Sequence, residues 1–272
     1  MIDPSDERLP RPKASGYQAH AKACAAAHDS NVPDDGQRAL DDYDQMADAY
    51  ADDAQVDPMK TTYDRPTILA MAGDVRGKRV LDVGCASGGL TELLVEGGAS
   101  VVGIDLNPRL VERARERVGE RAEFRVVDIS DPLPFGDSSF DVVTASLVLH
   151  YLADWGPPVR EFARILRPGG LFVMSTHHPT QDLEIGPPGA SYFDRVLLTD
   201  TWRKGGRDFE VRFYHRPISA IVDTLADAGL LIEWIPEPIP RREAFSAAFY
   251  EKMVKGPWFL FIKAVKLGRR GS

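Results

Sequence analysis

Three features are scarce or missing in this 272-residue sequence, and each absence narrows what the chain can be. Cys24 and Cys85 are its two cysteines, too few for a disulfide framework, which favours a reducing, cytoplasmic setting. No uninterrupted apolar stretch approaches the length of about 18 residues that a membrane span requires, and residues 1–12 lack the apolar core of a signal peptide. There is no basic tract either, and the net charge of −8 argues against a nucleic-acid partner.

The hydrophobic fraction of 43% is enough to bury one sizeable core, so we expect a single α/β domain with elaborations. The predicted organisation is an arm at 1–38, partly disordered or helical, a main domain at 39–266, and a basic tail at 267–272. Within the arm, 14–28 is rich enough in alanine for a helix. At the start of the main domain, 39–54 has the apolar spacing of an amphipathic helix.

From residue 79 to residue 176, short apolar runs alternate with helical patterns. The strand candidates are 79–83, 99–105, 122–128, 140–146 and 171–176, and the helix candidates between them are 89–96, 108–118 and 159–166. This alternation predicts right-handed crossovers and a doubly wound, mostly parallel sheet, which we expect to have seven strands.

After residue 179 the regular alternation of strand and helix patterns stops, and we interpret 179–215 as an inserted lid. We expect a loop at 181–191 and a hairpin with strands at 196–202 and 209–214. A helix should begin at Pro217 and end before Gly229. The last two strands, 230–234 and 258–265, should pair in antiparallel fashion at the sheet edge.

The run VLDVGCASGGL at 80–90 is the most informative in the chain. It reads as a buried strand, a glycine-rich turn and the first turn of a helix, in which the loop backbone approaches a ligand closely. Ligands of doubly wound sheets bind beyond the carboxyl ends of the strands. Asp105 ends the next strand, 21 positions after Gly84, where a carboxylate can accept both hydroxyls of a ribose. Asp128 ends the third strand and could accept from an adenine amino group.

These segments resemble class I S-adenosylmethionine-dependent methyltransferases, in particular the small-molecule branch of quinone-biosynthesis and natural-product enzymes. The matching runs are VLDVGCASGGL, VVGIDLNPRLVERAR, VVDISDPLPF, FDVVTASLVLHYLADW and EFARILRPGGLFVMSTHHP. The resemblance covers roughly residues 39–178. It implies S-adenosylmethionine as the cofactor and a small organic acceptor, aromatic or apolar, methylated on O, N or C. It also fits a monomer or homodimer without a membrane partner.

Carried over to this sequence, the resemblance implies a set of cofactor contacts. Gly84, Ala86 and Gly88 would surround the methionine part, and Asp82 would brace their loop. Asp105 would bind the ribose. The other implied contacts are Leu106, Asp128 and Ile129 at the adenine, Ser146 and Leu147 at the methionyl group, Tyr43 and Tyr50 closing over the cofactor, and Tyr63 and Arg65 reaching its carboxylate. One position departs from the usual G-x-G-x-G pattern, since Ala86 replaces its middle glycine.

A proton-bearing acceptor would profit from a base, and histidine suits that role near neutral pH. We expect His178 or His215 to be this base or to contact the acceptor. His150 is interpreted as packing or pocket lining. No metal site is predicted, because neighbours on an extended segment point apart and no carboxylate is spaced to join the His177–His178 pair.

Two other functions stay open at this stage. A nicotinamide-dependent dehydrogenase would also use a glycine-rich loop, but its pattern wants glycine at position 86. A protein that binds S-adenosylmethionine without transferring methyl would need no particular base, so the residues cannot distinguish it from an enzyme.

Overall fold

The computed structural model describes residues 35–268, so the predicted helix at 14–28 lies outside the described part. The helices are α2 (Asp35–Asp44), α3 (Ala47–Asp53), the π-helix η1 (Met59–Asp64), α4 (Arg65–Ala72), α5 (Gly89–Glu96), α6 (Pro108–Val118), α7 (Gly156–Ile165), α8 (Pro179–Ile185), α9 (Ile218–Asp227) and α10 (Ala247–Met253). Three short 3₁₀ turns are η2 (Gly119–Arg121), η3 (Leu149–Tyr151) and η4 (Arg242–Ala244).

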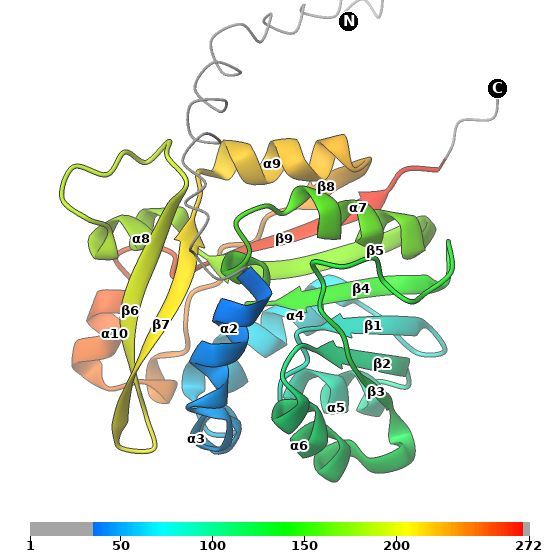
Figure 1. Ribbon diagram of the computed structural model, residues 1–272, viewed down its shortest axis with the longest axis horizontal. Helices are drawn as coiled ribbons and strands as arrows, with labels where there is room; N and C mark the ends of the chain where they lie inside the picture. Colours follow the sequence, from blue (N-terminus) through cyan, green and yellow to red (C-terminus); the bar gives the residue numbers. More distant parts are fainter. Residues whose placement is uncertain (1–34, 269–272) are drawn as a thin grey trace, which may run out of the picture. The chain divides into compact units, whose positions relative to one another are not determined.

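The strands are β1 (Arg79–Val83), β2 (Ser100–Asp105), β3 (Glu123–Val126), β4 (Phe140–Ser146), β5 (Leu166–His177), β6 (Val196–Lys204), β7 (Arg207–His215), β8 (Leu230–Trp234) and β9 (Phe259–Lys266). Seven of them form one sheet in the order β3-β2-β1-β4-β5-β9-β8 (Figure 1). Strands β1 to β5 are parallel, and β9 runs antiparallel to both of its neighbours. The predicted fold class is therefore confirmed.

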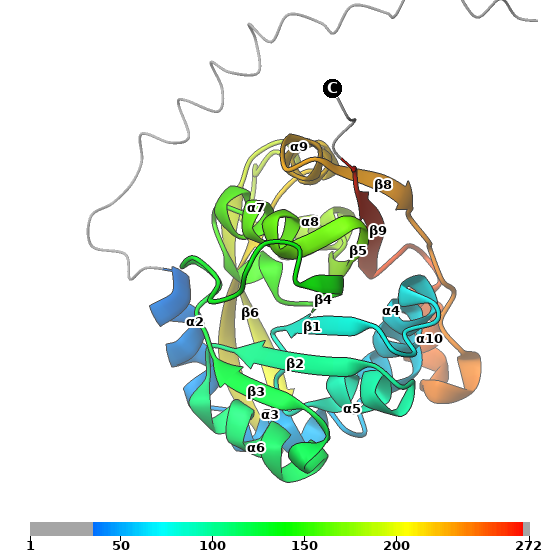
Figure 2. The same cartoon turned by 90° about the vertical axis from the view of Figure 1, so that its right-hand side faces the viewer.

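Helices cover both faces of this sheet because successive strand residues point to opposite sides. Leu81 belongs to a core with α7 and α9, whereas its neighbour Val80 belongs to a second core with α4 and α5. Both side chains are fully buried. The two layers can be followed around the sheet in Figure 2. The continuous apolar character of β1 thus reflects burial on both faces.

The order of the strands reverses between β1 and β4, since β2 and β3 lie on one side of β1 and β5 on the other. Such a reversal opens a crevice at the carboxyl ends of the strands. The predicted hairpin β6–β7 forms a separate two-stranded sheet, and residues of both of its strands contact the end of β5.

Two segments differ from their predicted structure. The single helix predicted at 39–54 is broken into α2 and α3 by a turn at 45–46, and α2 already begins at Asp35. Half of the loop predicted at 181–191 is instead helical, as α8. Pro179 occupies the first turn of α8, and the side chain of His178 accepts a hydrogen bond from the Thr180 amide. A histidine cap of this kind has no sequence signature, which is why the pattern suggested a loop.

Candidate functional site

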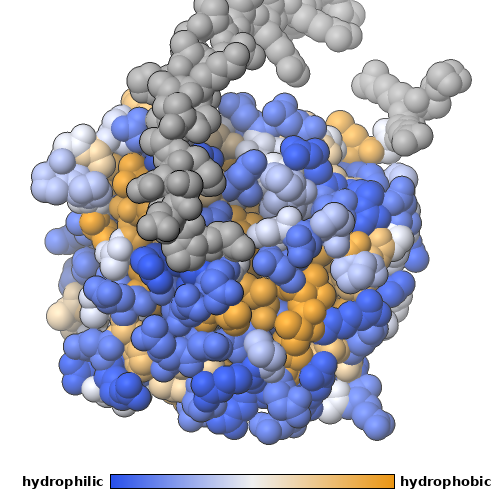
Figure 3. Space-filling model, in the orientation of Figure 1, coloured by the Kyte–Doolittle hydropathy of each residue, from blue (hydrophilic) through white to orange (hydrophobic). Residues whose placement is uncertain are grey.

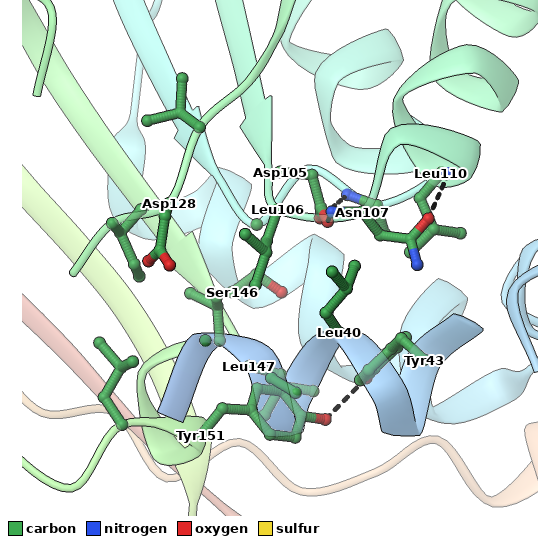
Figure 4. Close-up of a pocket in the computed structure, with 18 of the residues that line it drawn as sticks. Leu40, Tyr43, Asp105, Leu106, Asn107, Leu110, Asp128, Ser146, Leu147 and Tyr151 are labelled. Carbon is green, nitrogen blue, oxygen red and sulfur yellow. Dashed lines mark hydrogen bonds between the residues drawn. The ribbon is translucent and has the colours of Figure 1, made fainter. Parts of the chain in front are cut away.

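A cavity lies at the carboxyl ends of β1, β2, β3 and β4, beside helix α2 (Figure 4). The space within it, counted together with its open mouth, is about 740 Å³. Its wall is mostly apolar, and Figure 3 shows apolar surface gathered beside α2. The predicted residues that line it are Tyr43, Tyr50, Gly84, Ala86, Asp105, Leu106, Asp128, Ile129, Ser146 and Leu147. Most of the predicted cofactor contacts are therefore brought together by the fold.

The loop after β1 needs its glycine for a close approach within the protein itself. Gly84 has φ +66°, and a Cβ there would stand 2.6 Å from Cγ2 of Val148. Ala86 also adopts a left-handed backbone, with φ +47°, and so does Leu147 at the end of β4, with φ +50°. Such conformations are strained for residues with a side chain and concentrate at functional sites. Here both residues line the same cavity.

Asp105 and Asp128 stand at the ends of neighbouring strands on one wall of the cavity, and Figure 4 shows both carboxylates. The Asp105 carboxylate accepts hydrogen bonds from the backbone N–H of Ala86 and of Asn107, each at 2.9 Å. Burial raises the pKa of Asp105, and these two N–H donors oppose the rise. Asp105 thus organises the glycine loop in addition to facing the cavity.

A second, smaller cavity adjoins the first and shares Tyr50, Gly84, Ala86 and Ser146 with it. Its lining carries charges of both signs: Lys60, Asp64, Arg65 and Asp82. The guanidinium of Arg65 lies against the start of α5, where a Cβ on Gly89 would stand 2.5 Å from Nη2. A small cavity with cations and carboxylates together suits a zwitterion such as the amino-acid end of a ligand.

Both carboxylates of the smaller cavity are held by hydroxyl donors. Asp82 accepts from Oγ1 of Thr91 at 2.6 Å and of Thr144 at 2.9 Å. Burial raises the pKa of Asp82 to about 6, against the effect of these donors. Asp64 is fully buried and accepts from Oγ of Ser146 and of Ser175, at 2.5 and 2.6 Å. Asp82 is thus held by hydroxyl groups of α5 and β4, not by backbone N–H groups of the glycine loop.

Three tyrosines close the cavity on the side of α2. The hydroxyls of Tyr43 and Tyr151 are 2.6 Å apart (Figure 4). The ring of Tyr43 also meets that of Tyr50 edge to face. Helix α2 is fastened above them by Asp42, whose carboxylate receives the guanidinium of Arg212 from β7 at 2.5 Å. Tyr151 was not predicted at the site, because its place in the short turn η3 carries no periodic signal.

Two predicted contacts lie away from both cavities. The ring of Tyr63 packs 5.6 Å from Phe259 and 5.7 Å from Phe261, and Tyr63 lines neither cavity. Gly88 begins α5 with φ +79°, and a Cβ there would be 3.1 Å from Cβ of Ala114 on α6. Its place therefore indicates packing between two helices.

The two histidines expected as base are both engaged by the protein. Nδ1 of His178 caps α8 and lies 2.7 Å from Oγ1 of Thr180. His215 lies between the Asp182 carboxylate, 3.4 Å from Nδ1, and the Tyr192 carbonyl, 2.9 Å from Nε2. A third histidine, His177 at the end of β5, is less enclosed, with 17% of its side chain exposed.

Two structural features are not found in the described residues. Between Asp35 and Gly268, no group of three or more His, Cys, Asp or Glu residues could hold a metal ion. Over the same range, no helix has both the length and the apolarity to cross a bilayer.

Comparison with known proteins points to one family. A model described as a methyltransferase domain matches residues 81–174. A ubiquinone biosynthesis O-methyltransferase of Xanthomonas oryzae pv. oryzae is 38% identical over 132 residues, which make up 47% of this chain and 55% of that protein. The matched part of the chain thus spans about half the length of that relative.

Solved structures agree over more of the chain. The S-adenosylmethionine-dependent methyltransferase of Mesorhizobium loti is 25% identical, with a TM-score of 0.61 over 78% of this chain and 99% of that one. The 1,6-didemethyltoxoflavin-N1-methyltransferase of Burkholderia thailandensis is 20% identical and shares the fold, with a TM-score of 0.53 over 96% and 94%. The chain thus carries a methyltransferase domain at residues 81–174, and its strand order and the cavity at the strand reversal accompany a similarity to S-adenosylmethionine-dependent methyltransferases over most of its length.

Proposed function

We propose that this protein transfers a methyl group from S-adenosylmethionine to an oxygen, nitrogen or carbon atom of a small organic acceptor. The observation that carries the proposal is the pair of adjoining cavities, one apolar and the other charged, which meet at Gly84, Ala86 and Ser146. This division matches a ligand with a nucleoside at one end and an amino acid at the other.

Each part of the cofactor has a partner of suitable chemistry. In the apolar cavity, Asp105 would accept the ribose hydroxyls and Asp128 the adenine amino group, with Leu106 and Ile129 against the ring. In the charged cavity, Arg65 and Lys60 would face the carboxylate, while Asp82 and Asp64 supply negative charge for the ammonium group.

When bound, S-adenosylmethionine supplies an electrophilic methyl group on a positively charged sulfur. The task of the chain is then to hold the acceptor atom in line with that methyl, at about 3 Å, because positioning alone can supply about 7–11 kcal/mol of the barrier reduction. Ser146 lines both cavities and Leu147 lines the apolar one next to it, so both would flank the reacting end. The tyrosines under α2 would keep water away from it.

A small ring-bearing acceptor is supported by charge and by the named relatives. The net charge of −8 disfavours a polyanionic substrate. The relatives are named for ubiquinone biosynthesis and for 1,6-didemethyltoxoflavin. Aromatic side chains of the hairpin, among them Trp202, lie near His177 at the end of β5.

Equilibrium dialysis against S-adenosylmethionine, S-adenosylhomocysteine and a nicotinamide dinucleotide tests the cofactor. We expect retention of the first two only, and retention of the dinucleotide alone would refute the proposal. Incubation with labelled donor and a panel of phenols, quinols, indoles and amines then tests transfer. The expected product has gained one CH₂, detected by mass spectrometry together with S-adenosylhomocysteine.

A further inference from the structure

Three histidines and one aspartate from four separate elements meet at the carboxyl end of β5. They are His150 in η3, His177 in β5, Asp182 in α8 and His215 in β7. All but His177 are at least nine-tenths buried. Burying so many titratable groups costs free energy unless they form hydrogen bonds or ion pairs with one another or with a ligand.

Asp182 is the centre of this group. Its Oδ1 lies 3.8 Å from Nδ1 of His177, and its Oδ2 lies 3.4 Å from Nδ1 of His215. The other nitrogen of His215 faces the Tyr192 carbonyl, which only accepts, so that nitrogen carries a proton. Burial lowers the pKa of His215, but Asp182 and this carbonyl outweigh it and raise the pKa above its ordinary value. Both ring nitrogens of His215 thus face acceptor groups of the protein itself.

His177 has the opposite character. Its Nδ1 faces Asp182, which favours the tautomer with the proton on Nδ1 and leaves a lone pair on Nε2. Among residues 35–268, Nε2 has no hydrogen-bond partner. Burial lowers the pKa of His177, Asp182 and Asp200 oppose this, and Lys60 adds to it. A neutral, partly exposed imidazole backed by a carboxylate has the form of a general base.

His150 lies directly on this ring. The two imidazoles stack with centroids 4.3 Å apart, and the edge of Phe213 meets His177 at 4.4 Å. His150 is 1% exposed, and within the described part of the chain neither of its ring nitrogens has a partner. Buried polar groups without a partner destabilise the folded protein. They are a place where a polar ligand would be held.

His150 and His177 lie near residues of the site proposed for methyl transfer. Lys60 lines the charged cavity and is close enough to lower the pKa of both His150 and His177. Ser146 and Ser175, side by side on β4 and β5, connect the cavity wall to the strand that ends at His177. Neither histidine lines the two cavities, but His177 follows Ser175 by two residues on β5, and Ser175 holds Asp64 of the charged cavity.

We propose that His177 is a catalytic base for an acceptor with a ring hydroxyl, that Asp182 positions it, and that His150 binds the same acceptor. The inference rests on the proposed function. In the step, the hydroxyl oxygen forms a bond to the methyl carbon as the carbon–sulfur bond breaks and leaves its electron pair on sulfur. The hydroxyl proton passes to Nε2 of His177 and then to solvent. Asp182 stabilises the cation formed meanwhile, and its 3.8 Å contact would shorten with the acceptor bound.

The first test needs neither turnover nor an identified acceptor. Histidine-labelled protein saturated with S-adenosylhomocysteine is titrated by NMR, with resonances assigned from single His→Gln variants. We expect His177 to be neutral at pH 7 with its proton on Nδ1, and Asp182→Asn to weaken that preference. A charged His177, or one with its proton on Nε2, overturns the proposal.

The second test measures transfer to phenols and quinols. His177→Gln should lower kcat about 10²–10⁴-fold, remove the pH dependence assigned to this base, and leave S-adenosylhomocysteine affinity within twofold. Asp182→Asn should lower kcat less, because the base itself remains. A full rate in His177→Gln, or a loss that follows His178→Gln instead, overturns the role of His177. Transfer confined to acceptors without a hydroxyl overturns the substrate class, whereas failure to retain the cofactor would instead refute the proposed function.

Discussion

The Asp105 carboxylate accepts a hydrogen bond from the backbone N–H of Ala86 at 2.9 Å, which ties the end of β2 to the glycine loop after β1. The residue expected to bind the ribose therefore also fixes the loop on which the cofactor would lie. The same carboxylate would thus both hold the conformation of the loop and bind the ribose.

Replacing Asp105 should consequently abolish cofactor binding. Asp105→Ala removes the acceptor for two backbone N–H groups as well as the proposed ribose contact. We expect no measurable retention of S-adenosylhomocysteine by equilibrium dialysis. Asp74→Ala, an exposed aspartate ahead of β1, is the matched control and should bind normally. Unchanged affinity in Asp105→Ala would refute the ribose assignment.

Ala86→Gly should be tolerated, although it alters the centre of the loop. Ala86 has φ +47°, a conformation that costs a residue with a side chain about 1–2 kcal/mol, whereas glycine adopts it freely. Part of this gain is lost to the greater entropy of glycine in the unfolded chain. We expect the free energy of unfolding in urea to rise by up to about 1 kcal/mol and cofactor affinity to be kept. A tenfold loss of affinity would mean that the alanine methyl group contacts the cofactor.

The strand ends were predictable because a parallel sheet brings them to one edge. Asp105 and Asp128 are far apart in the sequence, yet both follow apolar runs. The alternation of strands and helices is enough to place the carboxyl ends of such strands side by side. The same logic located Ser146 and Leu147. The part of the site that lies on regular strands was therefore the part most readily predicted from the sequence.

The other half depends on irregular backbone and distant packing. Lys60 and Asp64 reach the charged cavity from the π-helix η1, whose wider turn is not visible in a period of 3.6 residues. Tyr63 was assigned to the cofactor, but Phe259 and Phe261, nearly 200 positions later, pack against it. The histidine cluster depends on Asp182, which lies in a helix where a loop was expected.

Arg65→Gln should separate the two ends of the cofactor. If Arg65 faces the amino-acid carboxylate, the variant loses affinity for S-adenosylhomocysteine but binds free adenosine as well as the parent does. We expect a loss of about 10–100-fold for the former, in line with removal of one charged hydrogen bond. Calorimetric titration with both ligands measures this. Arg76→Gln, an exposed arginine near the amino end of β1, is the control. An equal loss for both ligands would show that Arg65 only shapes the loop.

The buried carboxyl of Asp82 should make stability depend on pH in an unusual direction. Its pKa is about 6 in the folded protein against an ordinary value of 3.8, because burial disfavours the charge. The folded state therefore binds more protons than the unfolded state between these values. The contribution of Asp82 to stability is fully present below about pH 4 and is lost as the pH rises through 6, by roughly 3 kcal/mol in all.

Asp82→Asn removes this titration and keeps the shape of the side chain. Urea unfolding of both proteins at pH 4 and pH 7 isolates the effect, since other groups titrate alike in each. We expect the variant to gain about 2–3 kcal/mol relative to the parent between the two pH values. Its amide can still accept from Thr91 or Thr144, so the fold should persist. A constant difference at both pH values would mean that Asp82 is ionised over this whole range, held by Thr91, Thr144 and the nearby charge of Arg65.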